Sequence, residues 1–455
     1  MNTRADPDSV LSRPPRQAGK PVGAFIGSAK GRLLPASIPL RFFGAAAVYH
    51  LMAWLALAAS ALNGTLFDGA LGWSLAALHL VTLGVLSMSV LGAGAQLLPV
   101  ASRQPATGPG WLAAIWWLYT PGVAVLALGM GLARPVLIGV GAVACALALL
   151  GWGMLTARNL LGARGMPGVV GHGWAALAAL LVMLLAALAL VAIWLGWPAA
   201  PRAVVLVLHR VMAPYGFIGL FSVGLSYVLV PMFVLADAPD ERLQRASLLL
   251  LVAALALSAL SAFGLASVVL LGSGLLAGSA GVALHLWMMV RVLRQGMRRF
   301  AGPSAMLVQL GWGGLAASLV LAWALLLQWP LPHAGAWFGL CVIGVWQLGF
   351  LLGMLQRIAP FLAAMHVSGG RRAPTPSSLS HDGALRLHRL CHCGALLLLA
   401  AAIGTGSRSA AVAGAAVGVV GALAFCRFFW VLLERLQRAA TTPPTPSTHQ
   451  PPGGH

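Results

Sequence analysis

The chain has 455 residues, of which 60% are aliphatic, aromatic, methionine or cysteine residues and only 8% are charged. A soluble domain could not bury that much apolar surface, so the composition excludes a soluble globular protein. The net charge of +20 is better explained by arginines beside the cytoplasmic ends of membrane spans than by nucleic-acid binding, and we expect no nucleic-acid partner.

Apolar runs of 18 residues or more recur along the chain, and each is long enough to cross a lipid bilayer as a helix. A membrane span must satisfy its own backbone hydrogen bonds, and Leu and Ala dominate these runs, so the sequence favours helices over a barrel. We predict an all-α, polytopic membrane protein with about twelve transmembrane helices in three four-helix repeats. The expected spans are 41–62, 74–98, 111–132, 135–156, 174–196, 203–234, 246–264, 267–290, 305–328, 335–360, 384–404 and 409–433.

Basic residues divide unevenly between alternate loops. The N-terminal tail, the loops after the fourth, sixth, eighth and tenth spans, and the C-terminus each carry two or more of them. The opposite loops hold single arginines, such as Arg134, Arg202 and Arg408. Since positive residues stay on the cytoplasmic side, we predict a bacterial inner-membrane protein with both termini in the cytoplasm.

One motif recurs in the second, sixth and tenth spans, with two glycines eight residues apart and a proline seven residues later. Its members are Gly84, Gly92 and Pro99, then Gly216, Gly224 and Pro231, and in a shorter third copy Gly353 and Pro360. The spacing predicts three diverged copies of one unit: repeat one over 37–160, repeat two over 170–300 and repeat three over 301–438. The flanking segments 1–36 and 439–455 are polar and Pro-rich, and we predict disordered cytoplasmic tails there.

The motif has a physical interpretation. Gly84 and Gly92 lie about two turns apart on nearly one helix face, where small residues let a neighbouring helix or a flat ligand come close. Proline lacks an N–H and clashes with the preceding turn, so we expect Pro99 to end its helix at the cytoplasmic side. We predict that these positions serve helix packing.

Ionisable residues inside a membrane are costly and are therefore candidates for function. The predicted spans hold no mid-membrane Asp or Glu, which disfavours a proton-coupled or sodium-coupled carrier and a proton pump. They do hold histidines, whose neutral imidazole is a good ligand for haem iron, copper or zinc. These are His50, His79, His209, His285, His388 and His392.

His79 and His209 occupy corresponding places in two copies of the motif, both toward the outer face, and are the leading candidates for metal ligands. His333, in the outer loop before the tenth span, could reach the same zone. Arg210 either extends outward to the headgroups or pairs with an anionic group such as a haem propionate.

His388 and His392 lie one turn apart on the same helix face, and Cys391 and Cys393 flank the second of them. Such a set suits a soft metal such as copper, although the two cysteines point away from each other and the site lies toward the cytoplasmic end of its span. His50 and His285 lie nearer mid-membrane and are structural residues or part of a second site.

The series His79, Gly84, Gly92 and Pro99 resembles the second-helix pattern of the NnrS family, and the run Pro39-Leu40-Arg41-Phe42-Phe43 is similar to that family's Arg-Pro-Phe-Phe opening. NnrS proteins are twelve-span bacterial inner-membrane proteins associated with haem, copper and the response to nitric oxide. Three four-helix arcs also resemble the catalytic subunit of haem–copper oxidases. The resemblance implies that His79 is a haem ligand and His209 a copper or haem ligand.

The chain departs from both patterns. NnrS usually has a His-x-His pair in the second span, and the earlier position here is Ala77. The oxidase's paired histidines of the seventh span and its His-x-His of the tenth are missing, and Tyr215 follows His209 by six residues instead of four. We therefore do not expect a complete oxygen- or nitric-oxide-reducing centre, and whether the protein is an enzyme stays open.

These features lead us to expect an inner-membrane protein that binds haem or copper and acts in nitric oxide response, respiration or metal handling. Its partners would be the lipid bilayer and a gas ligand or redox partner. The alternatives are a secondary transporter or permease without a metal cofactor and an assembly subunit without a ligand. A bound chromophore distinguishes the first from the others.

Overall fold

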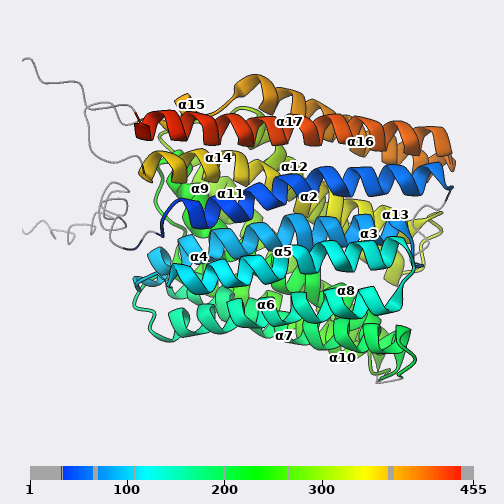
Figure 1. Ribbon diagram of the computed structural model, residues 1–455. Helices are drawn as coiled ribbons and strands as arrows, with labels where there is room; N and C mark the ends of the chain where they lie inside the picture. Colours follow the sequence, from blue (N-terminus) through cyan, green and yellow to red (C-terminus); the bar gives the residue numbers. More distant parts are fainter. Residues whose placement is uncertain are drawn as a thin grey trace, which may run out of the picture.

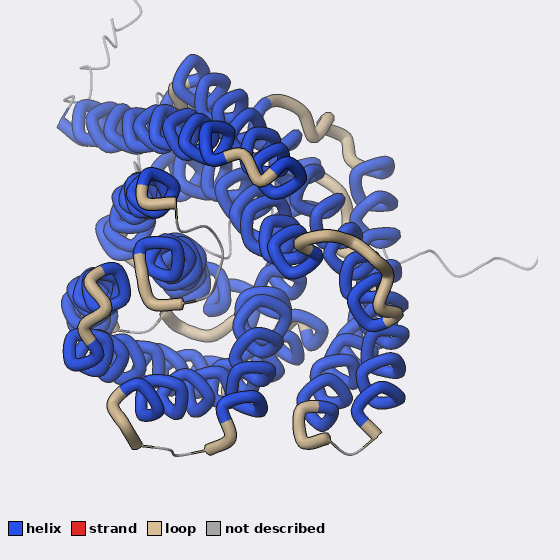
Figure 2. The backbone as a smooth tube through the Cα atoms, turned by 90° about the vertical axis from the view of Figure 1, so that its right-hand side faces the viewer, coloured by secondary structure: helices blue, strands red, loops and turns tan. Residues whose placement is uncertain are grey.

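The computed structural model describes residue 32 and residues 34–64, 70–106, 108–197, 200–264, 266–366 and 374–441. Within these residues, twelve helical segments are long and apolar enough to cross a membrane, in agreement with the prediction. They lie side by side in one bundle, which Figure 2 shows along the helices (Figures 1 and 2). The chain is therefore an all-α, multi-pass membrane protein.

The spans follow one another through short loops. They are α2 (Ser37–Leu62), α3–η2–α4 (Trp73–Ser102), α5 (Pro109–Gly131), α6 (Pro135–Leu161), α7 (Pro167–Trp194), α8–η3–α9 (Arg202–Val234), α10 (Glu241–Ser261), α11 (Ser267–Gln295), α12 (Pro303–Leu326), α13–η4–α14 (Ala334–His366), α16 (Asp382–Thr405) and α17 (Arg408–Thr441). A short helix, α15 (Pro376–Leu379), precedes α16.

Local signals explain several helix boundaries. Four spans begin with proline in the first turn, where its missing N–H costs nothing; these prolines are Pro109, Pro135, Pro167 and Pro303. The side chain of Asp240 accepts the backbone N–H of Arg242 at 2.7 Å and caps α10. The weakly punctuated run between α10 and α11 breaks at Gly264, whose φ of +85° suits glycine.

The three motif-bearing spans form the centre of the bundle. In their most apolar windows, 67%, 89% and 61% of the residues of the second, sixth and tenth spans are buried, against at most 50% in each of the other nine. The π-helical parts of the second and sixth spans both pack against that of the tenth. The remaining spans surround this centre, and α17 packs on α2 so that the last span lies beside the first.

The prolines of the motif do not end their helices, contrary to our expectation. Pro99 and Pro231 lie inside α4 (Met88–Ser102) and α9 (Leu220–Val234), and Pro360 lies inside α14 (Gly349–His366), which continues for six residues beyond it. In the first two copies the proline carbonyl accepts an N–H five residues later, from Gln104 and Ala236, after a left-handed residue. The proline therefore lies within a C-terminal capping turn of these two helices.

The predicted tails lie mostly outside the described residues. Of segment 1–36, only 32 and 34–36 are described. Of segment 439–455, residues 439–441 continue the helix α17, and the others lie outside the described residues. The start of α2 and the end of α17 lie on the same side of the bundle (Figure 1).

Candidate functional site

Each motif-bearing span contains a π-helical stretch that the sequence did not reveal. These are η2 (Leu80–Ser87), η3 (Met212–Gly219) and η4 (Leu340–Leu348), each preceded by a short α-helix: α3 (Trp73–His79), α8 (Arg202–Val211) and α13 (Ala334–Gly339). π-Helical turns are rare and are frequent at functional sites. The one signal they share is a glycine inside each stretch: Gly84, Gly216 and Gly344.

His79 and His209 lie just before two of these stretches, and the structure brings them together. His79 is the last residue of α3, and His209 lies in the last turn of α8. Their ring centres are 6.3 Å apart, and the ring planes are nearly parallel, at 11°. The two residues that the sequence marked as leading candidates therefore form one pair.

The hydrogen bonds of the pair leave ring nitrogens available. His79 Nδ1 lies 3.0 Å from the carbonyl oxygen of Leu75, which can only accept, so Nδ1 carries the proton and Nε2 keeps its lone pair. His209 Nδ1 is buried with no partner at hydrogen-bond distance among the described residues, and the backbone neighbour of the ring is Met183. A histidine that is oriented through one nitrogen and free at the other is the usual form of a metal ligand.

The spacing of the pair fits a single ion between the rings. Metal–nitrogen bonds of about 2.0–2.1 Å on opposite sides of one ion place two imidazole centres roughly 6 Å apart. No group of three or more His, Cys, Asp or Glu side chains within the described residues is arranged to hold a metal. The two imidazoles could hold a haem iron or a copper ion, but they fall short of a four-ligand zinc site.

The other residues predicted for this zone lie at the surface. His333 is exposed directly before α13, and Arg210 is exposed at the end of α8. Neither belongs to a three-ligand group in the described part of the chain.

His388 and His392 are fully buried in α16, with their ring centres 5.8 Å apart. Cys391 and Cys393, in contrast, are only half-buried. The neighbour of His388 that the sequence did not predict is His50 from α2, whose ring centre is 5.7 Å away. No spacing in the sequence indicates that contact, because the two residues lie in the first and the eleventh spans and are distant in the chain.

His285 also belongs to a cluster. Its Nδ1 lies 3.3 Å from the hydroxyl of Tyr227, and the Tyr227 ring contacts His172 with centres 5.4 Å apart. His172 is buried in the first turns of α7. The predicted span began only at residue 174, although Pro167 is the signal that places the start of the helix earlier.

The motif glycines face the preceding span of their own repeat. A Cβ on Gly84 would lie 2.6 Å from Tyr49 Cβ of α2, and one on Gly224 would lie 2.6 Å from His172 Cβ of α7. Gly92 and Gly216 likewise face α2 and α7, and Gly353 faces α12. Protein side chains and backbone, and not a flat ligand, occupy the space beside these glycines.

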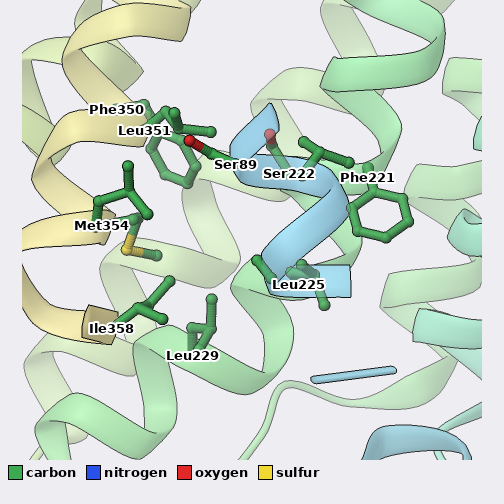
Figure 3. Close-up of a pocket in the computed structure, with 12 residues that line it drawn as sticks. Ser89, Phe221, Ser222, Leu225, Leu229, Phe350, Leu351, Met354 and Ile358 are labelled. Carbon is green, nitrogen blue, oxygen red and sulfur yellow. The ribbon is translucent and has the colours of Figure 1, made fainter. Parts of the chain in front are cut away.

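The three motif-bearing spans enclose a small apolar cavity on the central axis (Figure 3). Its volume is about 40 Å³, and its lining includes Ser89 from α4, Phe221 from α9 and Phe350 from α14. A space of this size holds on the order of one water molecule. It is too small for haem or for a metabolite.

No protein-family model matches the chain, and no curated protein matches it in sequence. Among solved structures, the fold matches a haem–copper terminal oxidase dimer determined by cryo-electron microscopy, with a TM-score of 0.56 and 10% sequence identity. The alignment covers 92% of this chain and 85% of the oxidase chain. The chain has a haem–copper oxidase-like fold. At this identity the similarity concerns the fold alone. The shared feature is the arrangement of twelve spans in three four-helix repeats.

Proposed function

We propose that this oxidase-like protein binds a haem iron or a copper ion between His79 and His209. The observation that carries the proposal is the near-parallel pair of imidazoles with centres 6.3 Å apart and with a buried, unpartnered Nδ1 on His209. An unpartnered polar atom in a membrane interior is costly, and a metal ion would satisfy it.

The two histidines do not occupy equivalent positions in their repeats. This difference supports a functional role for their contact. His79 precedes Gly84 by five residues, whereas His209 precedes Gly216 by seven. With the glycines aligned, the two histidines are offset by two positions, which is about 200° around a helix. The two histidines therefore precede the motif at similar but not identical positions. Duplication of one ancestral histidine does not account for the pair.

The chemistry of the proposed site follows from its small number of ligands. Bound iron or copper would supply a centre that binds a small gas such as nitric oxide or exchanges an electron. His79 and His209 would hold it near one end of the central helices, and the Leu75 carbonyl would fix the His79 tautomer. The described residues provide no third ligand, so we propose binding or electron transfer in a nitric oxide response of the NnrS type and not a complete reductase cycle.

The test is the absorption spectrum of detergent-purified protein, oxidised and dithionite-reduced, with metal analysis of the same sample. The protein is expressed with haem and copper supplied. We expect a Soret band that His79→Ala and His209→Ala lose, or about one more copper per chain in the wild type than in either variant. His333→Ala is the matched control, since this exposed histidine lies outside the pair.

A colourless, metal-free wild type would contradict the proposal, as would a spectrum that both variants leave unchanged. In either case substrate uptake into proteoliposomes becomes the measurement of choice, because a permease needs no bound metal.

A further inference from the structure

A second group of histidines lies deep in the bundle, between α2 and α16. His50, His388 and His392 are each at most 2% exposed. The ring centre of His388 is 5.7 Å from that of His50 and 5.8 Å from that of His392. These residues come from the first and eleventh spans, whereas the His79–His209 pair comes from the second and sixth.

Polar atoms without partners accumulate at this place. His50 Nδ1, His388 Nε2 and Gln356 Oε1 are buried and have no hydrogen-bond partner among the described residues. The His392 ring is buried too, and its backbone neighbour is Gly344. Proteins pair nearly all buried polar groups, and exceptions point to a missing water, ion or ligand. The concentration of such atoms at one point makes this place a candidate binding site.

The surroundings select the kind of ligand. Trp54 and Phe425 contact the His50 ring edge to face, with ring centres 6.3 and 6.0 Å away, and exclude water from that side. The described Asp and Glu residues lie in loops or at helix ends, so no carboxylate of theirs balances a charge here. Because the cost of burying an ion rises with the square of its charge, a monovalent ion costs about a quarter as much as a divalent one. Among metals that imidazole binds well, copper has a monovalent state.

We propose that His50, His388 and His392 form a Cu(I) site in the membrane interior. Two imidazoles that share one ion through bonds of about 2.0–2.1 Å have centres roughly 5–6 Å apart, close to the two distances observed. The three side chains do not yet converge on one point. Rotation of the imidazole rings about their side-chain bonds completes the site when the ion binds.

Gln356 of α14 is the positioning residue of this site. Its side-chain amide nitrogen lies 3.1 Å from His388 Nδ1, and its Oε1 has no partner. The two ends of an amide can exchange by a half-turn. With Oε1 facing the ring, the amide accepts the Nδ1–H of His388, satisfies its own oxygen and leaves the lone pair of Nε2 for the metal.

The experiment is an anaerobic Cu(I) titration of detergent-purified protein against a chromophoric Cu(I) chelator. In the His209→Ala background, which removes copper from the His79–His209 pair, we expect about one equivalent bound. That equivalent should be lost when His50→Leu or His392→Leu is added, and bound about 10–100-fold more weakly with Gln356→Leu. His285→Leu is the matched control, because His285 is equally buried in another span. The variants His79→Ala and His209→Ala should retain this copper, so failure of this proposal is distinguishable from failure of the proposed function.

Thermal unfolding separates a ligand from a packing role. Without metal, His392→Leu should melt near the wild-type temperature, because an apolar side chain of similar size replaces a buried imidazole. Cu(I) should raise the melting temperature of the wild type and leave that of His392→Leu unchanged.

Three outcomes would overturn the proposal. One is a wild type that binds no Cu(I) at this affinity, and the second is an equal loss of copper in His285→Leu. The third is sulfur in the X-ray absorption spectrum of the copper-loaded protein, because it would place the metal on Cys391 or Cys393 instead.

Discussion

At the scale of single residues, the glycines of the central helices show how closely the spans pack. A Cβ on Gly84 would lie 2.6 Å from Tyr49 Cβ, whereas one on Gly313 of α12 would meet nothing within 4 Å. Replacing glycine by alanine inside a helix otherwise gains about 0.5–1 kcal/mol. The two positions therefore predict opposite effects of the same substitution.

We expect Gly84→Ala to lower the stability of the protein by about 1–3 kcal/mol, since the span of Tyr49 must shift. Gly313→Ala should raise its stability slightly. Thermal melting in detergent, followed by tryptophan fluorescence, measures both. If the Gly84→Ala protein were as stable as Gly313→Ala, α2 could move away from the new methyl group without a loss of stability, and the prediction would be wrong.

At the scale of elements, the π-helical stretches set the direction in which the histidines point. One residue corresponds to about 100° of rotation around a helix. Deleting Thr82 from η2 (Leu80–Ser87) allows ordinary α-helical hydrogen bonds and turns His79 away from His209. We expect this deletion to remove the bound metal, and Thr82→Ala, which keeps the length, to retain it. Metal analysis and the visible spectrum make the comparison, and metal retained after the deletion would contradict a role for η2 in aiming His79.

The helices also show how much of the fold can be predicted from the sequence. All twelve spans were predicted. A helix in lipid must be long and apolar and must satisfy its own backbone hydrogen bonds, and the local sequence of each segment shows these properties. The π-helical stretches were not predicted, because an extra residue per turn leaves composition unchanged and is decided by packing. The expectation that Pro99 ends its helix was wrong for a related reason. Pro99 removes one hydrogen bond, and the capping turn beyond it supplies others.

At the scale of the whole molecule, the alternating loop charges predict the orientation in the membrane. We expect alkaline phosphatase, which folds only in the periplasm, to be inactive when fused after Arg438 and active when inserted at Ala200 between α7 and α8. Activity at both sites, or the reverse pattern, would contradict cytoplasmic termini.

The candidate sites divide in the same way between what the sequence shows and what only the assembled bundle shows. Inner-span histidines are visible in the sequence, and His79 and His209 stood out by their position before a repeated motif. The contact of His50 with His388 was not visible, because it depends on the last span, α17, packing against both α16 and the first span, α2. No local pattern encodes which helices close a ring.

The contact between α17 and α2 closes the ring of helices. The Cys426 thiol of α17 donates to the Ala47 carbonyl of α2 at 3.2 Å, and Arg408 donates to the carbonyl of Ala61 at 3.2 Å. During synthesis α2 enters the membrane before α16 and α17 and can contact them only after they have left the ribosome. The pocket around His50 is therefore finished last, and a chain truncated before α16 lacks two of its three imidazoles. Copper bound in this pocket would therefore show that the whole bundle, including α16, has been inserted and assembled.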